Sequence, residues 1–188
     1  MKIYIKNMVC DRCKMVVRSE LEKIGIFPVS VGLGEVELLE NLKENQKQEL
    51  EMKFQSFGFE LLEDKTTMLI EKIKSLIIDL VHHQNNTLKT NLSNYLSEQL
   101  VQDYSTFSTL FSEVQGATIE HYFITQKIEK VKELLMYKEL SLSEIAVKLN
   151  YSDVAHLSNQ FKKITGVTAT HFKQLADSSY KCNFFLIC

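Results

Sequence analysis

Two cysteines near the start of the chain have a spacing that can do chemistry. Cys10 and Cys13 are separated by two residues in the segment NMVCDRC, residues 7–13, where a strand pattern gives way to a helical pattern. A helix N-terminus lowers the pKa of nearby thiols, and thiolates prefer soft metals such as Cu(I). The pattern therefore predicts a soft-metal site at Cys10 and Cys13.

Two other uses of this cysteine pair stay open. A closed zinc site needs four ligands, and no other Cys or His occurs before His82, so zinc would require Asp11 or a second molecule. A thioredoxin-like redox pair is less compatible with the order of elements and with the position of the single proline, Pro28. Cys182 and Cys188 complete a set too small and uneven for a secreted disulfide framework.

An internal repeat is the second feature with chemical meaning. A shift of 50 residues places segment 91–123 over segment 141–173 with eight identical pairs. In the second copy a short helical pattern leads into a turn at 150–153 with a capping Ser or Asp, and a second helical pattern runs to about Lys163. Each copy therefore predicts a helix-turn-helix.

The elements that must position the cysteine pair lie in residues 1–64. Strand patterns cover residues 1–6, 28–31, 35–38 and 59–62. Between them lie two helical patterns, whose expected apolar residues are Met15, Val16, Val17, Leu21 and Ile24 in the first and Leu50, Phe54 and Phe57 in the second. The order βαββαβ predicts a ferredoxin-like fold.

The repeat lies in a region of helical patterns, residues 65–176. An apolar stripe from Ile70 to Val81 predicts one helix, and the adjacent His82 and His83 are expected to form its solvated end. Residues 118–137 predict a single helix between the two copies, about 30 Å long. Such a helix could hold two recognition helices in successive major grooves, which lie about 34 Å apart.

Residues 1–64 resemble the heavy-metal-associated (HMA) domain of copper chaperones and copper-pumping ATPases, whose loop has the motif Met-x-Cys-x-x-Cys. The cysteine pair and Met8 fall on this motif, and segment 57–60 falls on the family's glycine-aromatic pair. The resemblance implies that the cysteines bind Cu(I) and that Met8 packs under the loop. The sequence departs from the family at Asn7, where glycine is usual. A fold kept for dimerisation, or for sensing another signal, is the alternative.

Residues 68–176 resemble the DNA-binding domain of AraC/XylS-type transcription regulators. The segments that follow the family signature are 133–135, 142–146, 150–153 and 157–168. In that family two helix-turn-helix units joined by one helix bind adjacent major grooves. The departures are Asn159, where the second unit has its signature arginine, and Ala169, where a proline follows Thr168.

This resemblance implies a set of DNA contacts in the second copy. The residues placed on the exposed side of its recognition helix are Val154, Ala155, His156 and Asn159. Asn pairs bidentately with adenine and His donates to purines, so base contacts would favour A·T pairs. The phosphate candidates are Lys162, Lys163, Lys173 and the backbone near Thr168. The residues expected in the core are Leu157, Phe161 and Phe172.

The first copy is a weaker candidate for DNA contact. Segment 90–126 has no Lys or Arg but contains the acids Glu98, Asp103, Glu113 and Glu120, which repel phosphate. Its hydroxyl groups could still reach bases, from Tyr104, Ser105, Thr106 and Thr109. The second copy is therefore expected to dominate affinity for DNA.

Composition narrows the class of protein. The 188 residues carry 22 basic and 24 acidic side chains, a net charge of −2, and the only arginines are Arg12 and Arg18, so a downstream DNA interface must rely on lysine. An apolar fraction of 45% excludes disorder for most of the chain. No apolar run reaches about 18 residues, which predicts a cytoplasmic protein without a membrane partner. No catalytic constellation stands out, so we do not expect an enzyme.

Together these patterns predict a ferredoxin-like α+β domain at 1–64, an all-α domain of two helix-turn-helix units joined by a long helix at 65–176, and a frayed tail at 177–188. The predicted function is a sequence-specific transcription regulator that binds double-stranded DNA and responds to a soft metal such as Cu(I). A homodimer and a contact with RNA polymerase are further expected interactions. The alternatives are a metal chaperone or buffer with a helical protein-docking module, and a CxxC oxidoreductase.

Overall fold

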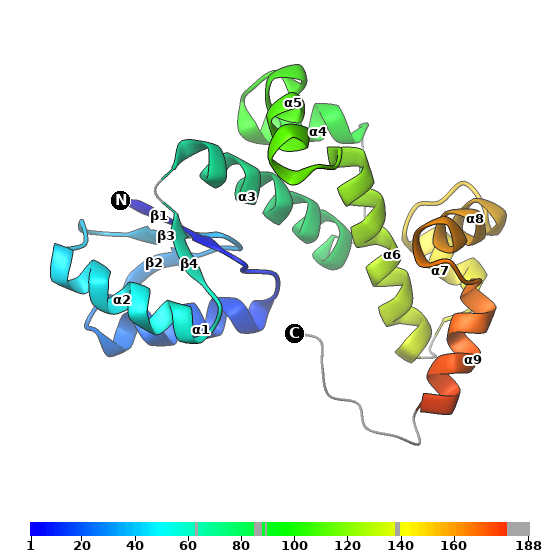
Figure 1. Ribbon diagram of the computed structural model, residues 1–188, viewed down its shortest axis with the longest axis horizontal. Coiled ribbons are helices and arrows are strands. Elements are labelled where there is room, and N and C mark those ends of the chain that lie inside the picture. The colour runs from blue at the N-terminus through cyan, green and yellow to red at the C-terminus, as the bar shows by residue number, and fades with distance from the viewer. Residues whose placement is uncertain (63, 85–87, 89, 138–139, 180–188) are drawn as a thin grey trace. The chain divides into compact units, whose positions relative to one another are not determined.

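The computed structural model describes residues 1–62, 64–84, 88, 90–137 and 140–179, and its elements are drawn in Figure 1. Within them the chain forms two compact units. Unit 1 comprises Met1–Asp79 and Leu96–Phe111, and unit 2 comprises Leu80–Tyr95 and the described residues from Ser112 onward.

Unit 1 contains a four-stranded antiparallel sheet. Its elements in chain order are β1 (Lys2–Lys6), α1 (Asp11–Lys23), β2 (Pro28–Val31), β3 (Glu35–Leu38), α2 (Glu44–Ser56) and β4 (Glu60–Leu62). The strands lie in the order β2-β3-β1-β4, and each neighbouring pair is antiparallel. The predicted order βαββαβ is therefore confirmed, and this part of the chain is an α+β unit.

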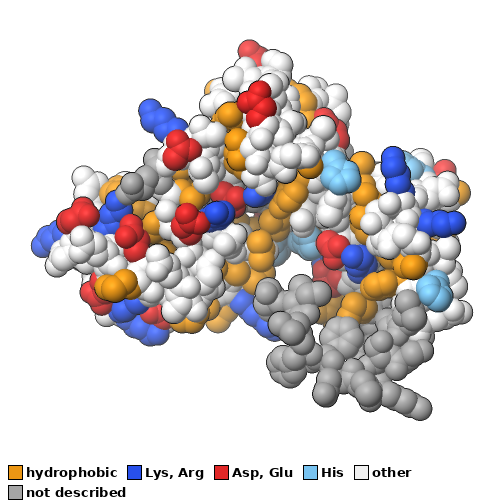
Figure 2. Space-filling view, viewed as in Figure 1, with side chains coloured by type: hydrophobic (Ala, Val, Ile, Leu, Met, Phe, Trp, Pro, Cys, Tyr) orange, Lys and Arg blue, Asp and Glu red, His pale blue; other side chains and the backbone are white. Residues whose placement is uncertain are grey.

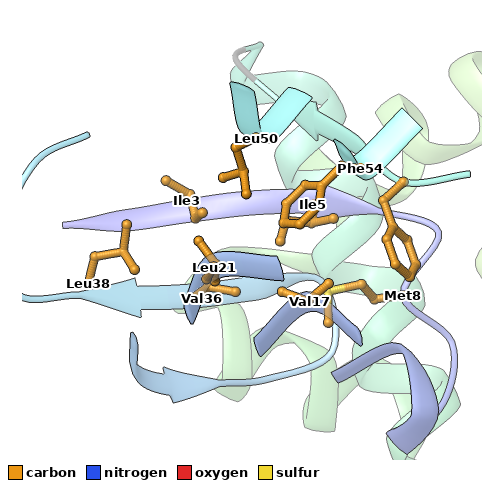
Figure 3. Close-up of a cluster of buried hydrophobic side chains, with 10 residues drawn as sticks. Ile3, Ile5, Met8, Val17, Leu21, Val36, Leu38, Leu50 and Phe54 are labelled. Carbon is orange, nitrogen blue, oxygen red and sulfur yellow. The ribbon is translucent and has the colours of Figure 1, made fainter. Parts of the chain in front are cut away.

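The core of the α+β unit lies between one face of the sheet and the two helices α1 and α2. Strand side chains alternate between faces, so every second residue of β1 and β3 reaches this core. Figure 3 shows the cluster, whose labelled members are Ile3, Ile5, Met8, Val17, Leu21, Val36, Leu38, Leu50 and Phe54. The predicted packing of Val17, Leu21, Leu50 and Phe54 is confirmed, because each is fully buried.

Two residues expected on the same apolar sides are exposed instead. Met15 is 71% exposed. Two residues that are two positions apart in a helix point about 200° apart around its axis, so Met15 faces solvent when Val17 is buried. Phe57 is 51% exposed because α2 ends at Ser56, which leaves Phe57 at the C-cap rather than on the helix.

A further helix, α3 (Lys65–Ile78), covers the other face of the sheet (Figure 1). It begins where the Asp64 carboxylate accepts a hydrogen bond from the Thr67 N–H at 2.8 Å, a standard N-cap. Its contact with the turn before β3 is close: a β-carbon at Gly34 would lie 2.7 Å from Ser75 Oγ, and Gly34 has φ +78°. A glycine is therefore required there on two counts.

The predicted boundary between residues 64 and 65 falls between β4 and α3 and stays a prediction, because compact unit 1 includes α3 as well. The helix that was expected to run to Val81 changes to a π-helix, η1 (Asp79–His83), after Ile78. The predicted apolar stripe is nevertheless buried: Ile70, Ile73, Ile77, Leu80 and Val81.

The remaining helices form the two predicted helix-turn-helix copies and their connection. They are α4 (Leu92–Leu100), α5 (Tyr104–Gln115), α6 (Ile119–Tyr137), α7 (Leu142–Lys148), α8 (Val154–Thr165) and α9 (Ala169–Ser179). The 19 residues of α6 match the predicted single helix and make it about 28 Å long. Residues 180–188 of the predicted tail lie outside the described residues. In the part of the chain that is described, no helix has the length and apolar character to cross a membrane.

Candidate nucleic-acid interface

Local hydrogen bonds fix the two helices of the second copy. Ser141 and Glu144 form a capping box at the start of α7: the Ser141 N–H donates to Glu144 Oε2 at 2.7 Å, and the Glu144 N–H donates to Ser141 Oγ. These bonds lower the pKa of Glu144. At the start of α8 the Asp153 carboxylate accepts from the His156 N–H at 2.7 Å, which lowers the pKa of Asp153. Asn150, with φ +54°, turns the chain between them.

The second copy packs its apolar side against α6 and α9. Leu157 and Phe161 of α8 are fully buried, and the Phe161 ring meets the Phe172 ring edge to face at 5.6 Å. The other buried members of this cluster are Ile128, Val131, Leu135, Ile145, Ala146, Leu149, Tyr151 and Ala169. The core positions expected for Leu157, Phe161 and Phe172 are confirmed.

The opposite side of α8 faces solvent and carries the predicted base-contacting residues. Ala155, His156 and Asn159 are exposed, and Val154 is half-buried. His156 is held in place by two neighbours, since its Nδ1 lies 3.1 Å from Ser152 Oγ and its ring meets the Tyr151 ring edge to face. The structure thus brings Ala155, His156 and Asn159 to one exposed helix surface with a positioned imidazole, whereas Val154 packs against the buried cluster that contains Leu157 and Phe161.

The predicted phosphate-contacting residues lie at the C-terminal end of α8 and in and before α9. Lys162 and Lys163, in the last turn of α8, are exposed, and Lys173 of α9 is half-buried. Thr168 caps α9, because its Oγ1 accepts from the His171 N–H at 3.2 Å. Within the described residues these three lysines have no ion-pair partner. Figure 2 shows lysine and histidine side chains standing out from the surface formed by α7–α9.

The first copy repeats this design with other surface residues. Phe107 and Phe111 are fully buried at the positions that correspond to Leu157 and Phe161. The predicted contacts Ser105, Thr106 and Thr109 are exposed, and Tyr104 is half-buried with its ring edge to face with Phe107. Thr109 Oγ1 donates to the Ser105 carbonyl at 3.1 Å, so this hydroxyl is engaged within its own helix.

Val101 makes the turn of the first copy strained. It has φ +54°, a conformation that a β-branched residue rarely adopts, and it is 87% exposed. We expect Val101→Gly to raise the free energy of unfolding by about 1 kcal/mol, because the strain is relieved and no packing is lost. Urea unfolding measures this change. Val114→Gly, at an exposed position inside α5, should instead lower stability, and an unchanged or lower stability of Val101→Gly would contradict the strain.

A buried lysine is the feature that the sequence interpretation missed. Lys127 of α6 is 7% exposed, and its Nζ lies 3.7 Å from the centre of the Tyr151 ring and 5.7 Å from that of Phe123. The Tyr151 hydroxyl donates to Gln160 Oε1 at 2.8 Å, which fixes the ring under the ammonium. The sequence does contain a signal for this burial, because Lys127 lies at helical spacing from Ile124 and Val131 on the apolar side of the helix.

Burial lowers the pKa of Lys127 from 10.5 to about 8. Between pH 8 and pH 10.5 this lysine is therefore mostly protonated in the unfolded chain and mostly neutral in the folded one. The free energy of unfolding should rise as the pH increases above about 8. Attraction of the ammonium to the ring offsets part of the burial penalty. We expect a gain of about 1 kcal/mol between pH 7 and 9.5 in urea unfolding. Lys127→Met should lack this component, and identical pH profiles for both proteins would contradict it.

His82 departs from the solvated helix end that was expected. Its Nε2 lies 3.3 Å from Gln126 Oε1, and its Nδ1 lies 3.8 Å from Glu133 Oε2. Burial and the nearby Lys130 lower the pKa of His82. The prediction fails for His82 because the π-helical turn directs this side chain onto α6, whereas His83 is exposed as expected.

The cysteine pair lies at the start of α1. Cys10 is the N-cap residue and Cys13 lies in the first turn, with the two sulfurs 3.4 Å apart. Both side chains are half-buried, and Met8 belongs to the buried cluster against which Cys13 packs. The pKa of Cys13 is raised, chiefly by burial, so the expectation that the helix N-terminus lowers both thiol pKa values is wrong for Cys13. Among the described residues no cluster of three or more His, Cys, Asp or Glu could hold a metal.

Asn7 replaces the glycine of the resembled loop at a position with φ +70°, a left-handed conformation that Asn tolerates. Its Nδ2 donates to the Gly58 carbonyl at 2.8 Å and so ties the cysteine loop to the end of α2. Asn7 therefore adopts and stabilises a left-handed conformation at this position of the loop.

Comparisons with known proteins support the prediction of helix-turn-helix structure in the helical part of the chain. Residues 96–175 match the family model described as a helix-turn-helix domain. The chain is 23% identical over 104 residues, 55% of its length, to the uncharacterized HTH-type transcriptional regulator YtdP of Bacillus subtilis and to the probable transcriptional regulator LumQ of Photobacterium leiognathi. It spans only 13% and 42% of those relatives.

A solved structure has a fold similar to that of the helical part of the chain. The C-terminal domain of AraT, a response regulator from Geobacillus stearothermophilus, aligns with a TM-score of 0.50 and 22% identity, over 60% of this chain and 88% of that one. Residues 96–175 therefore match a helix-turn-helix domain, and the helical part of the chain shares the fold of that AraT domain. Both matched relatives are described as transcriptional regulators, in agreement with the expectation that the chain is not an enzyme.

Proposed function

We propose that the chain is a sequence-specific, DNA-binding transcription regulator of the AraC/XylS type. The observation that carries this proposal is the exposed side of α8, where Asn159 lies one turn from Lys162 and Lys163 on a helix that is buried on its other side. This is the arrangement of a recognition helix, in which polar side chains reach base edges and cations contact phosphates.

The proposed contacts divide into two sets. Bases would be contacted by Val154, Ala155, His156 and Asn159, with Asn159 pairing with adenine. Phosphates would be contacted by Lys162, Lys163, Lys173 and the N-terminus of α9 behind Thr168. In the first copy, Tyr104, Ser105, Thr106 and Thr109 would make secondary contacts, because no cation supports them.

Selection of bound sequences from a random pool of duplex DNA tests this function. We expect an enriched motif with A·T pairs at the positions that α8 contacts. Asn159→Ala should relax the preference at those positions, whereas Gln174→Ala, at an exposed position of α9, should leave the motif unchanged. A pool that shows no enrichment for the unaltered chain would argue against sequence-specific binding.

For the α+β unit we propose a ferredoxin-like, HMA-like domain that binds a soft metal. Support comes from the sheet order β2-β3-β1-β4, the position of the cysteine pair at the start of α1, and the burial of Met8. The residues fit such an ion: two sulfurs that share a metal through bonds of about 2.3 Å lie within about 4.6 Å of each other, and these lie 3.4 Å apart. The metal, when bound, would supply a charge and a crosslink between Cys10 and Cys13.

Metal uptake has a direct test with a matched control. Under reducing conditions the purified chain should take up about one Cu(I) per chain or per dimer. The double variant Cys10→Ser, Cys13→Ser should lose this uptake, and Cys182→Ser with Cys188→Ser should keep it. Equal uptake by the first double variant would place the site elsewhere. Dimer formation and contact with RNA polymerase stay predictions.

A further inference from the structure

A cavity of about 230 Å³ lies in unit 1 between the sheet and α3. The sheet side is formed by Tyr4 and Glu35, which are directly paired across β1 and β3 and so share one face, together with the turn at residues 32–34. The helix side is formed by Lys72, Ser75, Leu76 and Asp79. These residues follow the spacing i, i+3, i+4, i+7, so a single side of α3, continued by Asp79 directly after it, lines the cavity.

Two charged groups at this cavity have incomplete partners. Glu35 Oε1 accepts a hydrogen bond from Lys2 Nζ at 3.2 Å, but Glu35 Oε2 is buried and has no hydrogen-bond partner in the described structure. A buried carboxylate oxygen without a donor is costly, and native structures seldom leave one. Across the cavity Lys72 has no ion-pair partner among the described residues. Lys14, the other lysine of the lining, pairs with Asp11 at 2.9 Å.

A ligand with two opposite charges would satisfy both groups. A simple cation would pair with Glu35 and leave Lys72 unmatched, and a simple anion would do the reverse. The volume lies below the roughly 300 Å³ at which sites for drug-sized molecules begin, so the ligand must be small. Leu33 and Leu76 add apolar surface to the lining.

We propose that this cavity binds a free α-amino acid. The ammonium group of the ligand donates to the Glu35 carboxylate, whose side chain lines the cavity. The carboxylate of the ligand accepts from Lys72 Nζ, and its side chain packs against Leu33 and Leu76. The proposal concerns binding to the α+β unit and α3, so it stands independently of DNA binding and of metal uptake at the cysteine pair.

Thermal unfolding of the full chain with each of the twenty standard α-amino acids is the first measurement. At least one should raise the midpoint of unit 1 unfolding, because a ligand that binds the folded state stabilises it. Calorimetric titration with that amino acid should then show that Glu35→Gln and Lys72→Met each weaken binding by about tenfold or more. The matched changes Glu37→Gln on β3 and Lys65→Met on α3, both outside the cavity, should alter it by less than about twofold.

The proposal is overturned if none of the twenty amino acids shifts the midpoint. It is equally overturned if Glu35→Gln and Lys72→Met bind as tightly as the unaltered chain, or if the two matched controls lose as much affinity. Circular dichroism establishes that each variant is folded, and should one of the two cavity variants fail to fold, the other decides.

Discussion

Replacing Lys162 and Lys163 with alanine is expected to weaken binding to every duplex DNA, random or selected, by about tenfold or more. Both ammonium groups are exposed in the last turn of α8 and have no ion-pair partner among the described residues. Each phosphate contact that is lost removes a released counterion, so the slope of log K against log salt should become shallower by about two for the double variant. Fluorescence anisotropy at several salt concentrations measures affinity and slope together.

The matched comparison is the double variant Tyr104→Ala, Thr109→Ala in the first copy. Its effect should be much smaller, because segment 90–126 contains no cation and the Thr109 hydroxyl already bonds to the Ser105 carbonyl. If the first-copy variant lost more affinity than the lysine variant, the second copy would not be the dominant DNA-binding element.

Phe161→Ala is expected to lower the free energy of unfolding of unit 2 by about 3–5 kcal/mol. Phe161 is fully buried and meets Phe172 edge to face, so its removal loses apolar burial and leaves a cavity between α8 and α9. Urea unfolding followed by circular dichroism should show an earlier transition for the helical unit.

Val147→Ala provides the control for that experiment. Val147 lies on α7 in the same unit but is 80% exposed, so its truncation should change stability by less than about 0.5 kcal/mol. A loss below about 1 kcal/mol for Phe161→Ala would mean that the packing of α8 against α9 does not hold this unit together.

Much of the fold could be predicted because local patterns and tertiary packing agree. The alternation that buries Ile3 and Ile5 specifies β1, and the glycines at 116 and 166, with φ +67° and +78°, end the corresponding helices α5 and α8. Thr118 and Thr168 then cap the following helices in both copies by accepting from the His121 and His171 N–H groups. The repeat therefore shares its turn chemistry as well as its core.

The errors arise where tertiary environment overrides local chemistry. A helix N-terminus lowers a thiol pKa, yet burial raises that of Cys13, and only the packing around the loop decides which effect is larger. The sequence pattern places His82 at a solvated helix end and does not single out Lys127, although neighbours from other elements enclose both side chains. The cavity beside Glu35 depends on the approach of α3 to the sheet, which no local pattern in residues 65–78 specifies.

The central claim is that this chain binds DNA through the lysine-bearing side of the second helix-turn-helix. A titration of the full chain into fluorescently labelled random duplex DNA, repeated over a range of salt concentrations, tests it most directly. A DNA-binding regulator predicts measurable affinity at low salt that falls linearly in log K with log salt. Absence of binding at the lowest salt would contradict this claim and would favour a metal chaperone or buffer whose helical half docks onto another protein.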